Sequence, residues 1–197
     1  NLGTAQLIEK AIERREGLLA SGGGFVVRTG DHTGRSPKDK FVVRDAATEA
    51  TVNWGPVNQP FQPEQFELLY GKLLAYLQAR DLFVQDCFAG ADPRFQLPIR
   101  VITERAWHSL FARQLFVRPD PEKTGEHVPG FTVIDAPGFR AHPGDDGTNS
   151  ICFVIVNFTR KMVIIGGTAY AGEVKKAIFS VLNYYLPADG VLPMHCS

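Results

Sequence analysis

Hydrophobic positions along the chain recur with two different periods, and these periods separate expected helices from expected strands. A recurrence near 3.6 residues predicts helices over residues 4–20, 63–80, 104–116 and 172–185. Short continuous apolar runs predict strands over residues 25–28, 40–44, 82–84, 99–102 and 131–134. Two further runs, Ile151 to Phe158 and Lys161 to Ile165, are separated only by Thr159-Arg160 and predict a hairpin. A hairpin combined with strand–helix alternation favours an α/β fold with a mixed β-sheet flanked by helices.

The composition is that of a globular protein with a full core. The 197 residues are 44% hydrophobic, which suits a single domain over residues 1–197. The chain balances 21 basic against 21 acidic residues, and this zero net charge argues against nucleic acid as a partner. No run of about 18 apolar residues occurs, so no membrane-spanning helix is predicted.

Three cysteines, Cys87, Cys152 and Cys196, are odd in number and widely spaced. This usage is typical of reduced, mostly buried thiols and predicts a cytoplasmic protein. The chain begins with neither an initiator Met nor a basic region followed by apolar residues, so no secretory signal is expected. Because the chain also stops abruptly after Met194-His195-Cys196-Ser197, we expect it to be part of a longer polypeptide.

A short cationic loop runs from Thr29 to Lys40 between two of the expected strands. Gly30, Gly34 and Pro37 bend it, and it presents Arg35 together with two lysines. A guanidinium offers a planar fork that matches a carboxylate or a phosphate. The loop therefore predicts a binding site for a small anion, although its glycines could equally serve chain reversal alone.

The expected helix over residues 172–185 carries a candidate lysine. Its apolar stripe has the i, i+3, i+4, i+7 spacing and comprises Val174, Ala177, Ile178, Val181, Leu182 and Tyr185. Lys176 lies roughly 200° from Val174 around the helix, at about 100° per residue. Two interpretations stay open. Lys176 is either a solvated surface lysine or, if the helix is covered on both faces as the off-stripe Phe179 suggests, a lysine in a cleft.

Two further segments near the C-terminus are candidates for chemistry. Residues 166–172, Gly-Gly-Thr-Ala-Tyr-Ala-Gly, link a strand to this helix at the place where α/β proteins bind ligands. They match neither the dinucleotide fingerprint nor the Walker A spacing. His195 lies among apolar neighbours, so it is either a packed core histidine or a ligand.

Taken together, these motifs resemble ATP-dependent phosphoenolpyruvate carboxykinase, and the resemblance covers nearly the whole chain. It is carried by residues 29–40 (TGDHTGRSPKDK), 55–58 (GPVN), 102–104 (ITE), 166–176 (GGTAYAGEVKK) and 193–197 (PMHCS). The resemblance implies that the chain is the N-terminal lobe of a two-lobed enzyme, with a mixed sheet. In this family a second, C-terminal lobe supplies the nucleotide side of the cleft.

The resemblance also implies a reaction and roles for four residues. Oxaloacetate and ATP would become phosphoenolpyruvate, CO2 and ADP, by decarboxylation to an enolate and then phosphoryl transfer, a step of gluconeogenesis. Arg35, Tyr170 and Lys176 would be catalytic and substrate-binding: Arg35 on the carboxylate and later the CO2, Tyr170 as a hydrogen-bond donor. Lys176 and His195 would be cofactor-binding ligands of Mn2+ (or Mg2+).

The same resemblance predicts where ATP binds and what the 197 residues can do alone. ATP would be bound mainly by the second lobe of the same polypeptide, which is absent here, so the 197 residues alone are expected to be inactive. Two alternatives remain open: a non-catalytic module that binds a phosphorylated metabolite, and a structural lobe that makes oligomer contacts. A glycine-rich loop ending in Gly-Lys-Thr soon after Ser197 would favour the carboxykinase over the binding module.

Overall fold

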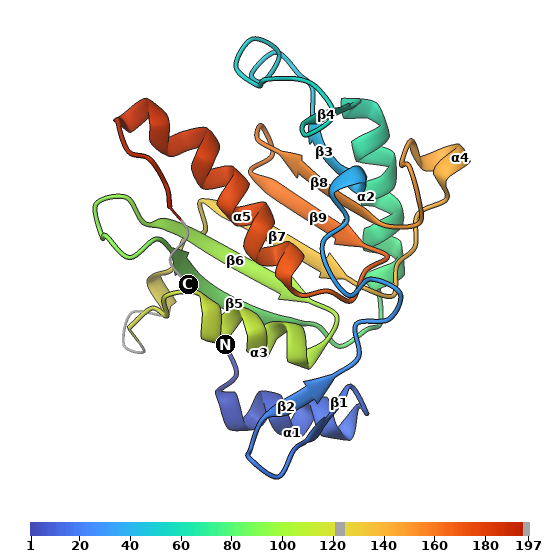
Figure 1. Cartoon of the computed structure of the whole chain (residues 1–197), viewed down its shortest axis with the longest axis vertical. Helices are drawn as coiled ribbons and strands as arrows, with labels where there is room; N and C mark the ends of the chain where they lie inside the picture. Colours follow the sequence, from blue (N-terminus) through green and yellow to red (C-terminus); the bar gives the residue numbers. More distant parts are fainter. Residues whose placement is uncertain (121–124, 195–197) are drawn as a thin grey trace.

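The computed structural model describes residues 1–120 and 125–194, and a seven-stranded sheet forms its centre (Figure 1). The strand order is β4-β3-β8-β9-β7-β6-β5. The strands are β3 (Lys40–Val43), β4 (Gln59–Phe61), β5 (Phe83–Ala89), β6 (Leu97–Thr103), β7 (Phe131–Ala136), β8 (Phe153–Asn157) and β9 (Met162–Gly166). Pairing is antiparallel between β8 and β9 and between β5 and β6, and parallel elsewhere. The predicted mixed sheet and hairpin are therefore confirmed.

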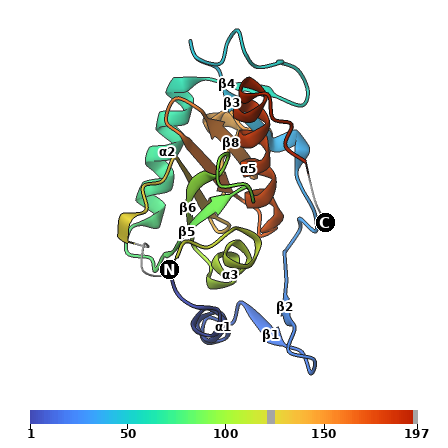
Figure 2. The same ribbon diagram turned by 90° about the vertical axis from the view of Figure 1, so that its left-hand side faces the viewer.

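Two helices cover opposite faces of this sheet (Figure 2). Helix α5 (Gly172–Tyr185) packs Val174, Ala177, Ile178 and Val181 against one face of the central strands. Helix α2 (Pro63–Leu77) packs Phe66, Leu69, Leu73 and Leu77 against the other face. The strands between them are buried on both sides, which is why their sequences are almost continuously apolar.

A smaller unit of one helix and a two-stranded ribbon lies beside the main sheet, and here one prediction was wrong. The expected helix over residues 4–20 ends early, because α1 spans only Thr4–Glu13 and Arg15 takes a positive φ of 56°. Residues Gly17–Leu19 instead form β1, which pairs antiparallel with β2 (Phe25–Val27). Leu18 and Leu19 match the helical period, yet their side chains are exposed on this ribbon. Helix α1 packs against α3 (Ala106–Leu115).

The other differences from prediction are a missed edge strand, short helices and shifted element ends. Strand β4 lies within residues 51–62, which the glycine and proline content marks as a loop, and it contains Pro60 at the sheet edge. Helix α2 stops at Leu77, three residues short of its predicted end. The short helices are η1 (Pro37–Asp39), α4 (Pro143–Asp146) and η3 (Leu186–Asp189). No helix among the described residues is long and apolar enough to span a membrane.

Two of the three cysteines have the predicted environment. Cys87 and Cys152 are free and buried, and burial raises the pKa of each thiol to about 12. Such thiols are poor nucleophiles because little thiolate forms at neutral pH. Cys196 lies outside the described residues.

Candidate functional site

The cationic loop is fastened to the first turn of α5. The backbone N–H of Ser36 donates a 2.6 Å hydrogen bond to Oε1 of Glu173, and both residues are buried. The Ser36 hydroxyl is also hydrogen-bonded to Nδ1 of His32 at 2.8 Å. A carboxylate in the first turn suits the positive end of the helix dipole. These contacts place Arg35, the preceding residue, beside α5.

Arg35 and Lys176 lie between two adjoining hollows. The first, about 240 Å³, is lined by Arg35, Ser36, Lys40, Glu173, Lys176 and Val57 among others. The second, about 340 Å³, is lined by Arg35, Trp107, Phe111, Tyr170, Lys175 and Lys176 among others. Three of the predicted site residues, Arg35, Tyr170 and Lys176, therefore meet at one place although up to 141 positions separate them in the sequence. The fourth, His195, lies outside the described residues.

The glycine-rich loop after β9 lets Tyr170 take its place in this site. Gly167 has a φ of +69°, and a Cβ there would lie 2.1 Å from the carbonyl oxygen of Ile151. A Cβ on Gly172 would lie 2.4 Å from Cε1 of the Tyr170 ring. Only glycine allows these close approaches. The loop glycines thus reverse the chain and also make room for the tyrosine ring against the first turn of α5.

The surroundings of Lys176 bear on the two interpretations of the sequence. Lys176 and Phe179 are both partly buried rather than solvated, and the ammonium Nζ lies 5.6 Å from the centroid of the Phe179 ring. Lys176 lines both hollows, which favours the cleft interpretation over a fully solvated lysine. Among the lysines of the cationic loop, Lys40 lines the first hollow, whereas Lys38 is exposed and lines neither.

The buried Glu173 carboxyl and the partly buried Lys40 ammonium influence each other's pKa at this site. Burial raises the pKa of the Glu173 carboxyl, although the Ser36 N–H, Arg35 and Lys40 act in the opposite direction. Burial also lowers the pKa of the Lys40 ammonium, and Arg35 adds to that shift while Glu173 opposes it. Arg35, Lys40 and Glu173 therefore form one electrostatic cluster. With Lys176 beside it, the cluster carries excess positive charge suited to an anion.

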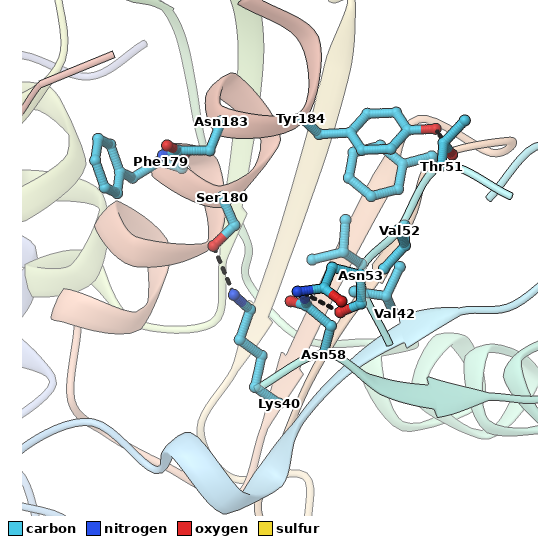
Figure 3. A pocket seen from close by; sticks show the side chains of 12 residues that line it. Lys40, Val42, Thr51, Val52, Asn53, Asn58, Phe179, Ser180, Asn183 and Tyr184 are labelled. Atoms are coloured by element: carbon cyan, nitrogen blue, oxygen red, sulfur yellow. Dashed lines mark hydrogen bonds between the residues drawn. The ribbon is translucent and has the colours of Figure 1, made fainter. Parts of the chain in front are cut away.

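Lys40 also reaches a third hollow, of about 370 Å³, between α5 and residues 51–58 (Figure 3). Its ammonium donates a 2.7 Å hydrogen bond to Oγ of Ser180, whose hydroxyl donates to the Lys176 carbonyl oxygen at 2.9 Å. On the other side of this hollow, Thr51 and Tyr184 are hydrogen-bonded at 2.8 Å. The polar groups of this hollow largely bind one another.

Sequence reasoning missed several residues that shape the site. Glu173 carries a local signal, an acidic residue in the first helical turn, but its bond to Ser36 spans 137 positions and no local pattern predicts it. The buried pair of His108 and Asp135 reaches the loop that carries Tyr170, and neither residue attracts notice in the sequence. Within residues 1–120 and 125–194, no group of three or more His, Cys, Asp or Glu side chains is placed to hold a metal ion.

The chain is an α/β protein with a cationic hollow at a glycine-rich strand-to-helix loop, an arrangement typical of anion-binding sites. The comparison with protein families then names the family. A family model described as phosphoenolpyruvate carboxykinase matches residues 1–197, and the chain belongs to that family.

Individual relatives are similar in sequence to nearly all of this chain. It is 56% identical to phosphoenolpyruvate carboxykinase (ATP) of Geobacter sp. (strain M21) over 98% of its length. It is 56% identical to phosphoenolpyruvate carboxykinase (ATP) 1 of Moorella thermoacetica and 55% identical to the enzyme of that name from Geobacillus kaustophilus, in both cases over 100% of its length. The chain spans only 37–38% of the length of these relatives.

Proposed function

We propose that this chain is the substrate- and metal-binding lobe of an ATP-dependent carboxykinase. The whole protein would convert oxaloacetate and ATP to phosphoenolpyruvate, CO2 and ADP, a reaction used in gluconeogenesis. The observation that carries the proposal is the convergence of Arg35, Tyr170 and Lys176 around two adjoining hollows. The family membership and the names of the relatives support the same reaction.

Each of these side chains has a role that its position supports. Arg35 is exposed at the junction of the hollows, where its guanidinium can bind the substrate carboxylate through two parallel hydrogen bonds and then retain the CO2. Tyr170 lines the second hollow, and its phenolic O–H donates a hydrogen bond to the carboxylate or to the developing enolate oxygen. The cationic surroundings favour the enolate because negative charge develops there.

Lys176 and His195 would hold a divalent metal, Mn2+ or Mg2+. Lys176 lines both hollows together with Arg35, a placement that fits a metal shared with a bound carboxylate. Of these two metals, Mn2+ fits two nitrogen donors better, because Mg2+ binds almost only to oxygen ligands. When bound, the metal supplies positive charge for the enolate oxygen and for the transferred phosphoryl group. ATP would be held mainly by a C-terminal lobe of the same polypeptide.

Calorimetric titration with phosphoenolpyruvate tests the binding role directly in the 197-residue chain. We expect weak binding that Arg35→Gln abolishes and that Lys38→Gln, a change in the same loop away from both hollows, leaves intact. In a full-length protein containing this chain, Arg35→Gln should raise the KM for oxaloacetate because the bidentate carboxylate contact is lost. A change confined to the KM for ATP would refute this role.

A non-catalytic anion-binding module is the second candidate, favoured by the partly buried Lys40 ammonium between the first and third hollows. Turnover decides between the two functions. A full-length protein that binds phosphoenolpyruvate through Arg35 but forms no phosphoenolpyruvate from oxaloacetate and ATP would be such a module. We expect turnover instead, because Tyr170 and Lys176 add a hydrogen-bond donor and a metal donor that simple anion binding does not need.

A further inference from the structure

A buried histidine–aspartate pair lies behind the loop that carries Tyr170. His108 on α3 and Asp135 on β7 are hydrogen-bonded through Nδ1 and Oδ2, and their side chains are 0% and 2% exposed. The other ring nitrogen of His108, Nε2, lies 3.1 Å from the carbonyl oxygen of Ala169. We propose that His108 and Asp135 are positioning residues that hold Tyr170 in the site, an inference that rests on the proposed function of Tyr170.

The chemistry of the contact determines where a proton must be. A backbone carbonyl only accepts hydrogen bonds, so Nε2 of His108 carries the hydrogen that reaches Ala169. The hydrogen bond between Nδ1 and Asp135 needs a second proton, which is carried either by Nδ1 or by the Asp135 carboxyl. In either arrangement Asp135 orients the ring and keeps Nε2–H directed at the loop.

Tyr170 itself makes two local backbone hydrogen bonds. The Tyr170 N–H donates to Oγ1 of Thr168 at 3.1 Å, and the Tyr170 carbonyl accepts from the Glu173 N–H at 3.1 Å. These local bonds fix the shape of the turn, and its C-terminal end is placed by the Glu173–Ser36 bond and by Ala171, which is buried against α3. His108 supplies a contact from 61 positions away, so it ties the turn to α3.

Asp135 connects the same contact to the central sheet. It stands beside Ile165 in the parallel pairing of β7 with β9, the strand from which the loop departs. The chain of contacts thus runs from β7 through His108 to Ala169, the residue immediately before Tyr170. A shift of about 1 Å at a reacting group can cost about 100-fold in rate, so an anchor of this kind is relevant to catalysis.

His127 provides a matched control for His108. Its side chain is also buried, and its Nε2 also lies 3.1 Å from a backbone carbonyl oxygen, that of Ile99, with Oδ1 of Asp86 3.8 Å away. It lies against the β5–β6 edge and does not contact the Tyr170 loop. Substituting His127 therefore removes a similar buried imidazole without touching the loop.

NMR of the unaltered chain with ¹⁵N-labelled histidine tests the proton assignment. We expect a hydrogen on Nε2 of His108, protected from exchange with solvent. A His108 ring with a bare Nε2 would overturn the proposal, because it could not donate to Ala169. This measurement needs no variant and no catalysis.

The position of Tyr170 is tested by ¹⁹F NMR of the chain labelled with 3-fluorotyrosine, its signal identified with Tyr170→Phe. We expect His108→Phe to shift or broaden the Tyr170 signal, His108→Gln to restore most of it because an amide N–H can reach Ala169, and His127→Phe to leave it unchanged. If His108→Phe does not fold, the smaller change Asp135→Asn serves as the second variant and should shift the same signal. The proposal would be overturned if the Tyr170 signal kept its chemical shift and line width in every folded variant of His108 or Asp135.

Kinetics of a full-length protein containing the chain complete the test. His108→Phe should lower kcat/KM for oxaloacetate about 10- to 100-fold, while His127→Phe leaves it unchanged. If the ¹⁹F signal of Tyr170 shifts in the His108 variants but the unaltered full-length protein shows no turnover, the proposed reaction is overturned and the anchoring of Tyr170 by His108 is not. Unmoved ¹⁹F signals with normal turnover would overturn the anchoring alone.

Discussion

The backbone N–H of Ser36 and the carboxylate of Glu173 are joined by a buried 2.6 Å hydrogen bond that spans 137 positions of the chain. This bond makes the cationic loop and the first turn of α5 a single unit. It also sets Arg35 and Lys176 at the junction of the same two hollows. The geometry of the candidate site therefore depends on a residue that need not touch the substrate.

Replacing Glu173 should separate the loop from the helix. Glu173→Leu leaves the buried Ser36 N–H without an acceptor, at a cost of about 1–3 kcal/mol in the free energy of unfolding. Glu173→Gln retains an acceptor oxygen and should cost less. Chemical denaturation of both variants measures the difference, with the exposed Glu9→Leu as control. Equal stability of the Leu and Gln variants would mean that the hydrogen bond contributes little.

Stability should also depend on pH through Glu173. Burial raises its pKa in the folded protein above the ordinary value of 4.5, so the folded state binds the proton more tightly than the unfolded state. The resulting contribution to stability is fully present below pH 4.5 and is lost as the pH rises through the folded-state pKa. The stability of the unaltered chain minus that of Glu173→Gln should therefore fall over this range. A difference that rises instead would contradict the direction of the shift.

Lys40 should show the opposite protonation linkage. Burial lowers its pKa below the ordinary 10.5, so charging it opposes folding at neutral pH, and this penalty is relieved as the pH rises toward 10.5. We expect Lys40→Met to gain stability relative to the unaltered chain at pH 7 and to lose that advantage near pH 10. Thermal unfolding at the two pH values measures this, with exposed Lys38→Met as the control that shows neither effect.

A methyl group on Gly172 should damage the site more than the fold. Its Cβ would lie 2.4 Å from the Tyr170 ring, so Gly172→Ala must displace that ring. Gly71→Ala in α2 is the matched control, because its Cβ meets no atom within 4 Å and should stabilise the protein by about 0.5–1 kcal/mol. Phosphoenolpyruvate titration should show weakened binding for the first variant only. Intact binding by Gly172→Ala would remove Tyr170 from the proposed site.

Lys176 should be necessary for metal binding by the full-length protein. Lys176→Met removes the amine that borders both hollows, and we expect Mn2+ affinity to fall at least about tenfold. The neighbouring Lys175→Met removes the same charge about 100° away around the helix, and Mn2+ affinity should be retained. Manganese titration followed by electron paramagnetic resonance distinguishes the two variants. Unchanged Mn2+ affinity in Lys176→Met would exclude it as a ligand.

The local elements were predictable wherever one period dominates. The apolar spacing of α5 predicts its observed limits, Gly172–Tyr185, because one face of that helix packs on the sheet. The same reasoning failed at Leu18 and Leu19, whose spacing continues that of α1 although both lie in an exposed strand. Strand β4 was missed because Pro60 is typical of a loop and is tolerated here at the edge of the sheet.

By itself the sequence determined the fold class, the cationic loop, the glycine-rich turn and the family resemblance, because these follow from local composition and short motifs. Only the tertiary structure decided that β3 pairs with β8 across 114 positions, that Glu173 binds Ser36, and that His108 reaches Ala169. The physical reason is that these contacts depend on strand order and register. Both arise from packing the whole sheet between α2 and α5, and no local segment encodes that packing.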